Sequence, residues 1–240
     1  MPRLALRTLA AAAAAALALP RCRGLAFAPY SALGPVMIGQ GREVAEGEAY
    51  AVNVVASACD CRMACWSNRR CVAASAVEAE DNSTLCRLST KGPFDSTLVE
   101  NLNATYIFWN KDAMMMDDGL VYTEATRRGY FVEAEALCSG VPGHRVPIFK
   151  TRAQQDVMGQ LLRLDSSRAF WVDLRKTSLT DYVWGDGTPF QDTEISAFLQ
   201  INRGFATEAV HSYFSALLEK PKTGFLERVV CQANPFGVEW

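Results

Sequence analysis

The sequence predicts an α+β protein built from two small, disulfide-stapled domains. Eight cysteines are spread unevenly along the 240 residues, and short helical and strand-like segments follow one another without a long run of either. Small secreted domains use disulfides because their hydrophobic cores are limited. The expected organisation is a first domain over 32–112, a linker over 113–119 and a second domain over 120–234.

The N-terminus predicts a secretory signal peptide over residues 1–26. Arg3 and Arg7 precede an apolar stretch, residues 8–18, made almost entirely of Ala and Leu. That stretch is too short to cross a bilayer, which needs about 20 apolar residues. Cleavage after Ala18 would keep Cys22 in the mature chain, and cleavage after Ala26 would remove it. We therefore expect a secreted, extracellular protein.

Charge and motif content exclude several classes of function. The formal net charge is −2 and no block of like charge occurs, which argues against a nucleic-acid partner. After the leader, no apolar stretch is long enough to span a membrane. The chain has two histidines and none of the common nucleophile, phosphate-binding, dinucleotide or metalloprotease motifs. We expect a binding protein without a cofactor, not an enzyme.

In the first domain, five cysteines lie between positions 59 and 86. Cys61 and Cys65 are four residues apart and share one face of a predicted helix over 58–66. Strand-like segments surround this helix, over 50–55, 72–77, 85–88 and 105–109. These segments together predict a helix that disulfides hold against a small sheet.

This order of elements and cysteines resembles the PAN/apple family of extracellular modules. The resemblance implies two bridges, Cys61–Cys86 and Cys65–Cys71, that pin the helix to the neighbouring hairpin. Cys59 has no place in the pattern. It pairs with Cys22, joins another chain to form a disulfide-linked oligomer, or stays free. A zinc site is disfavoured because secreted thiols oxidise and no His lies nearby.

Two sequons, at Asn82 and Asn103, fall in or near the first domain. Both predict glycosylation of a surface. Asn82 is the stronger of the two because it lies in a polar segment between strands, whereas Asn103 adjoins a predicted strand.

The second domain has two widely spaced cysteines, Cys138 and Cys231. A bridge between them would close a loop of roughly 90 residues and contribute about 4 to 5 kcal/mol in the simplest loop-entropy estimate. Helices are predicted over 130–137 and 152–164, and strands over 170–174 and 182–184. Trp171 and Trp184 are expected in the core; Asp186 and Gly187 form a turn.

Four ordered segments of this half resemble the C-type lectin fold: Tyr130-Phe131-Val132-Glu133-Ala134-Glu135-Ala136-Leu137-Cys138, Trp171-Val172-Asp173-Leu174, Tyr182-Val183-Trp184-Gly185-Asp186-Gly187, and Arg228-Val229-Val230-Cys231-Gln232. They look like the family's first helix, its core strand, its Trp-x-Trp-x-Asp-Gly turn and its closing strand. The resemblance implies a lectin-like domain of two helices, antiparallel sheets and a loop region.

The calcium ligands of sugar-binding lectins are poorly matched. The nearest segments are Gln200-Ile201-Asn202, where Ile201 stands in place of a cis proline, and Phe225-Leu226-Glu227. A cis bond before a residue other than proline costs about 2.5 to 4 kcal/mol, so we expect no metal. The candidate ligand-binding residues are Gln200, Asn202, Glu208 and Glu227, within or beside loop residues 188–226. The aromatics of this segment, Phe190, Phe198, Phe205, Tyr213 and Phe214, are expected in the core.

The favoured function is therefore extracellular recognition or adhesion, with a glycan or a protein bound without calcium. A divergent calcium-dependent lectin and a structural component of an extracellular matrix or secretion are the alternatives.

Overall fold

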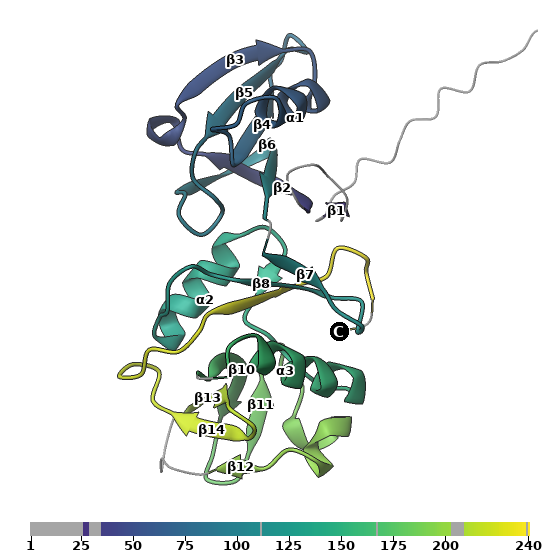
Figure 1. Ribbon diagram of the computed structural model, residues 1–240, viewed down its shortest axis with the longest axis vertical. Helices are drawn as coiled ribbons and strands as arrows, with labels where there is room; N and C mark the ends of the chain where they lie inside the picture. Colours follow the sequence, from purple (N-terminus) through teal and green to yellow (C-terminus); the bar gives the residue numbers. More distant parts are fainter. Residues whose placement is uncertain (1–25, 29–34, 111, 167, 203–208, 239) are drawn as a thin grey trace, which may run out of the picture.

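The computed structural model describes residues 26–28, 35–110, 112–166, 168–202, 209–238 and 240 (Figure 1). The signal peptide expected over 1–26 lies outside this range except for Ala26, and Cys22 lies outside it too. The described residues form mixed helix and sheet with three disulfide bonds, so the α+β fold class is confirmed. None of the described helices is long and apolar enough to cross a membrane.

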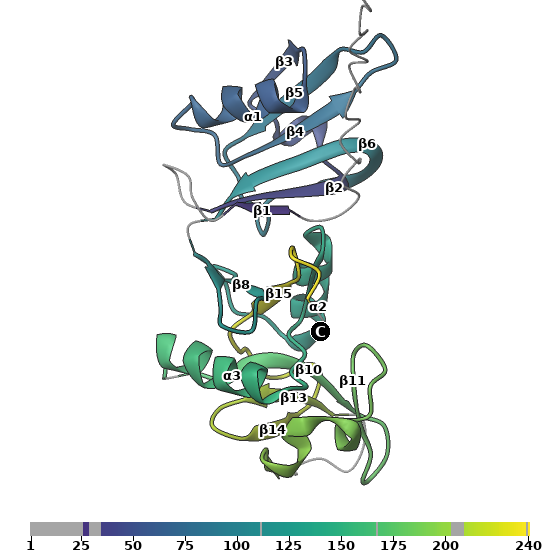
Figure 2. The ribbon, with the colours of Figure 1, turned by 90° about the vertical axis from the view of Figure 1, so that its right-hand side faces the viewer.

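The N-terminal half, residues 26–110, is a six-stranded antiparallel sheet in the order β1-β2-β6-β4-β5-β3. The strands are β1 (Ala26–Ala28), β2 (Val36–Val44), β3 (Ala51–Val55), β4 (Ala73–Glu78), β5 (Thr84–Ser89) and β6 (Leu98–Trp109). Helix α1 (Ala58–Trp66) lies across one face of the sheet, as Figure 2 shows, and a short 3-10 helix, η1 (Glu46–Glu48), joins β2 to β3. Ser57 caps α1 by accepting a hydrogen bond from the Asp60 amide at 3.2 Å.

Two disulfides hold α1 against this sheet. Cys61 bonds to Cys86 of β5, and Cys65 bonds to Cys71, two residues before β4 begins. These are the two pairs that the PAN/apple resemblance implied. Cys59 is exposed on α1 and unpaired among the described residues.

The C-terminal half, residues 112–240, contains two further sheets. One has the order β7-β8-β15-β9 and the other β11-β10-β13-β14-β12. Their elements are β7 (Ala113–Met115), β8 (Val121–Glu124), α2 (Phe131–Gly140), β9 (His144–Arg145), α3 (Arg152–Leu164), β10 (Phe170–Lys176), β11 (Tyr182–Trp184), η2 (Phe190–Asp192), η3 (Glu194–Ala197), β12 (Ile201–Asn202), β13 (Val210–Tyr213), β14 (Leu217–Lys220) and β15 (Val230–Ala233). The bond Cys138–Cys231 joins α2 to β15, which is the bridge expected between the two cysteines of this half.

The segment expected to be a linker is part of a sheet. Met114 pairs with Tyr122 across the β7–β8 hairpin, and Met114 and Met116 pack against the core of the C-terminal half. Gly119 has a φ of 77°, which suits a tight turn. The polar residues expected to be a linker therefore form the turn of a hairpin in which Met114 and Met116 face the core and Met115 is exposed.

The two halves share a hydrophobic core. Met37, Tyr106 and Phe108 of the N-terminal sheet cluster with residues of the C-terminal half. These are Val121 of β8, Val141 directly after α2 and Ala233 of β15. The loop between α2 and β9 approaches β2 so closely that a Cβ on Gly39 would overlap the side chain of Pro142. Glycine at position 39 is thus required for the two halves to dock as they do.

We predict that Gly39→Ala lowers the free energy of unfolding by about 1 to 3 kcal/mol, because the added methyl group overpacks the contact with Pro142. Urea denaturation of the full chain measures this. Gly47→Ala is the matched control, because nothing lies within 4 Å of the position its Cβ would take. Equal stability of the two variants would show that the contact at Gly39 is not tight.

Candidate functional site

The two tryptophans of the lectin-like motifs are core residues. Trp171 is fully buried, donates its indole N–H to the Gly129 carbonyl at 2.8 Å, and meets the Phe131 ring edge-on. Trp184 is also buried and packs beside Phe190. Their roles in this structure are packing and orientation of the strands that carry them.

Asp186 and Gly187 form the turn after β11. Gly187 has a φ of 90°, and an Asp186 oxygen accepts a hydrogen bond from the Thr188 amide at 3.0 Å. The other Asp186 oxygen pairs with Lys150 at 2.9 Å. Partial burial alone would raise the pKa of Asp186, but the bonds from Lys150 and Thr188 hold that pKa below its ordinary value. This carboxylate is engaged in the turn.

The structure does not gather the candidate ligand-binding residues at one point. The Gln200 carbonyl accepts a bond from the Leu217 amide at the start of β14. Glu227 pairs with Lys220, at the other end of β14, at 3.8 Å. Three residues of strand separate those ends by about 10 Å. Asn202 is placed by its backbone in β12, and Glu208 lies outside the described residues.

Glu227 differs from an exposed loop carboxylate in its electrostatics. Burial raises its pKa above the ordinary value, although Lys220 and nearby arginines oppose that shift.

A carboxylate that the sequence analysis missed lies nearer to β12. Glu219 of β14 is fully buried, and both of its oxygens contact the Lys176 ammonium, at 3.1 and 3.3 Å. The Tyr182 hydroxyl donates to the same carboxylate at 2.8 Å. Strand alternation was the available signal, because Leu217 and Glu219 share the face of β14 that turns toward the core. Among the described residues, no three His, Cys, Asp or Glu side chains gather as a metal site.

Two of the aromatics expected in the core are exposed. Phe190 and Tyr213 are buried, whereas Phe198 is 56% exposed and Phe214 41% exposed. Phe198 follows η3 and stacks against the Arg152 guanidinium at 3.9 Å, and Phe214 lies in the turn between β13 and β14. The prediction was wrong for these two because both lie at the ends of elements, where the ring faces outward. Phe205 lies outside the described residues.

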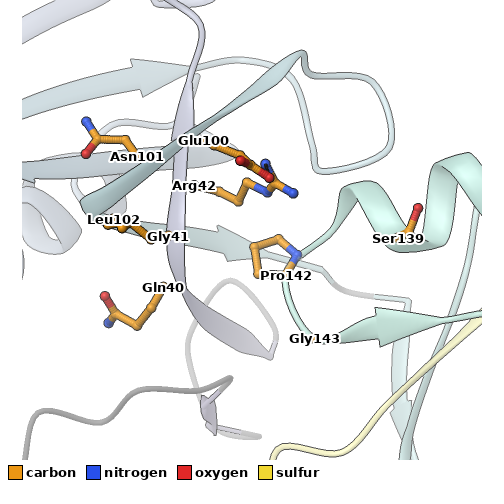
Figure 3. A pocket seen from close by; sticks show the side chains of 9 residues that line it. All are labelled: Gln40, Gly41, Arg42, Glu100, Asn101, Leu102, Ser139, Pro142 and Gly143. Carbon is orange, nitrogen blue, oxygen red and sulfur yellow. Dashed lines mark ion pairs between the residues drawn. The ribbon is translucent and has the colours of Figure 1, made fainter.

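A cavity of 530 Å³ opens between the two halves and is shown in Figure 3. We call it the Arg42 cavity. A bulge in the pairing of β2 with β6 forms the N-terminal wall of this cavity. Gln40 pairs with Thr105 and Arg42 pairs with Glu100, so the single residue Gly41 on β2 faces the four residues of β6 between Glu100 and Thr105. In the view, Arg42 and Glu100 lie beside each other, with Pro142 of the α2–β9 loop to one side. Leu102 stands out from the bulge and is 93% exposed.

A second cavity of 430 Å³, the Trp109 cavity, also receives residues from both halves. Its walls come from the α1–β4 turn, the segment after β5, the end of β6 and the end of β8. The lining includes Arg69, Phe94, Asp95, Trp109, Asn110 and Asp112. Sequence reasoning did not find either cavity, because each is assembled from segments far apart in the chain.

Both histidines are buried, and neither is among the residues that line these two cavities. Burial lowers the pKa of His144 to about 4, and burial also lowers the pKa of His211. Each ring donates its Nδ1 proton to a backbone carbonyl, of Pro142 and of Leu174 respectively. Both histidines therefore have a structural role in the packed interior.

Comparisons with known proteins find matches among solved structures only. No family model matches the chain, and no curated protein matches it. C-type lectin domains match about half of it. The C-type lectin domain of murine dendritic cell inhibitory receptor 2, solved with an N-glycan, covers 52% of this chain and 97% of its own at 18% identity and a TM-score of 0.40. The mouse scavenger receptor C-type lectin carbohydrate-recognition domain covers 53% and 98% at 12% identity and a TM-score of 0.40. Human lithostathine covers 52% and 89% at 15% identity and a TM-score of 0.39. These scores are too low to carry a conclusion about ligands.

We predict that the folded chain loses about 2 kcal/mol of stability between pH 7 and pH 5 through His144. The unfolded histidine titrates near 6.5 and the folded one near 4, so the unfolded state binds the extra proton in this window and unfolding becomes easier as the pH falls. Urea midpoints at several pH values measure the loss. In His144→Gln the free energy of unfolding should fall less between pH 7 and pH 5. An unchanged fall in that variant would contradict the role given to His144.

We also predict that Lys176→Met lowers the free energy of unfolding by about 3 kcal/mol, because it removes the buried ammonium from Glu219. The double variant Lys176→Met/Glu219→Leu should recover most of that loss. Lys220→Met is the control, since its pair with Glu227 is looser and should contribute less than about 1 kcal/mol. A double variant no more stable than the single one would show that the two groups are not coupled.

Proposed function

We propose that this chain is a secreted recognition or adhesion protein whose second domain, residues 120–234, is C-type lectin-like and binds a glycan or a protein without calcium. The first domain, residues 32–112, is PAN/apple-like in this proposal. Its support is the pair of disulfides that pin α1 to the sheet.

The main support for binding without calcium is the ion pair between Lys176 and Glu219. Calcium takes six to eight oxygen ligands, and the buried carboxylate beside β12 already contacts an ammonium with both oxygens and a tyrosine hydroxyl with one. A protein-borne cation thus neutralises this carboxylate. Gln200 and Glu227, at opposite ends of β14, do not add to it.

Exposed apolar side chains mark the surface that would meet a ligand. Phe198, Phe214, Phe225 and Leu226 are all exposed within the loop residues 188–226 or beside β14. Loops on a rigid scaffold are the usual location of binding surfaces, and aromatic side chains are enriched in them. A glycan and a protein loop both fit this description.

Secretion is supported by three disulfides, which persist in oxidising compartments. Glycosylation is proposed at Asn82, which is exposed with a φ of 62° in the β4–β5 turn, and at Asn103, exposed on β6. Cys59 is exposed, which leaves its thiol accessible to a second chain.

We predict that millimolar calcium, or an excess of chelator, leaves the melting temperature of the full chain unchanged. A ligand that binds only the folded state at a hundredfold excess over its Kd stabilises it by about 2.7 kcal/mol. For a chain of this size that corresponds to a shift of roughly 5 to 10 °C.

A calcium-dependent shift that Glu219→Gln abolishes would replace this proposal with the divergent calcium lectin. A glycan array with and without chelator tests the ligand class. Self-association in the ultracentrifuge without any soluble ligand would favour the structural matrix component.

A further inference from the structure

The Trp109 cavity has the size and position of a ligand site. Its volume of 430 Å³ falls in the range of small-molecule pockets, about 300 to 1,000 Å³. It lies at the junction of the two halves, where the shared core of Tyr106, Phe108 and Val121 holds its walls together. A site built on such a core is formed before any ligand arrives.

The floor of the cavity is aromatic and aliphatic. Trp109 is 8% exposed, Phe94 is half-buried, and Val72 lines the same space. The Trp109 amide donates to the Val72 carbonyl at 3.1 Å, which fixes the two residues relative to each other. Rigid apolar surface of this kind suits the C–H face of a ring.

The rim carries both signs of charge. Arg69, Asp95 and Asp112 are exposed and have no ion-pair partner among the described residues. Glu124 is already paired with Arg228, at 2.6 Å. A cation would be attracted by the two aspartates but repelled by Arg69, and an anion would be attracted by Arg69 but repelled by the aspartates, so neither sign of charge suits the whole rim. Asn110, Thr90 and Thr126 add neutral donors and acceptors.

A ligand that satisfies this rim is uncharged and carries groups that both donate and accept hydrogen bonds. Hydroxyl groups do both, whereas an ammonium or a carboxylate does only one. We infer that the Trp109 cavity is a binding site for a neutral saccharide, with the sugar ring on Trp109 and Phe94 and its hydroxyls on Arg69, Asp95 and Asp112. This site is separate from loop residues 188–226 and does not depend on the proposed function of those loops.

Saturation-transfer NMR on the full secreted chain tests the inference. The probes are neutral hexoses and N-acetylhexosamines, with sialic acid as the anionic probe and lysine amide as the cationic one. We expect a neutral sugar to bind and the two charged probes not to bind. Binding of a charged probe alone, or of no neutral sugar, would overturn the inference.

Matched variants then locate the site. Arg69→Gln and Asp112→Asn each remove a charged hydrogen-bonding group and should weaken binding roughly tenfold or more. Arg70→Gln and Asp117→Asn are the controls: both residues are exposed and neither lines the cavity, so binding should be unchanged. Since all four positions are exposed, the fold is expected to survive each change.

Gln200→Ala separates this site from the lectin-like loops. If that variant loses sugar binding while Arg69→Gln and Asp112→Asn retain it, the saccharide belongs to the loops. The cavity inference is then wrong, and the proposed function stands. If the cavity variants lose binding and Gln200→Ala retains it, the saccharide is held at the junction.

Discussion

The close contact between Gly39 and Pro142 sets the relation between the two halves of this molecule. Because Gly39 has no Cβ, the α2–β9 loop reaches the backbone of β2. Phe108 and Val141 then enter one hydrophobic cluster, and His144 is buried beside Phe108. Both junction cavities follow from that docking, since each takes its walls from both halves. A flexible linker would have left neither.

Buried charged and polar groups order the interior of the C-terminal half. The strands β10 and β14 carry Lys176 and Glu219 into the core, and Tyr182 of β11 completes the set. Desolvation makes such a pair a modest contributor to stability. The pair instead constrains how the strands are arranged, because three strands of one sheet must keep their register for the three groups to meet. Arg228 acts similarly, joining Glu124 of β8 to the carbonyls at the end of α3.

Local patterns predicted local structure well. The helices over 58–66 and 152–164 match α1 and α3, because helical spacing and Ser or Thr caps are features of the immediate sequence. The two cysteine pairs of the first half were implied by the family resemblance, and the structure contains both. Met114 and Met116 were read as linker because composition does not reveal which face a short hairpin buries. The cavities escaped prediction for a stronger reason: Arg69 and Asp112 are brought together only by β-sheet pairing and by docking of the two halves.

Strands β12 and β14 lie at the far end of the C-terminal half (Figure 1), whereas the Trp109 cavity is lined by residues of both halves at their junction. The contact at Gly39 and the shared core hold their separation fixed. Two sites at a fixed spacing engage one extended ligand only when its repeat matches that spacing, and they then gain effective concentration without a new contact. If both proposed sites bind, rigidity at the junction would select ligands by length as well as by chemistry, which a chain with a flexible linker between its halves would not do.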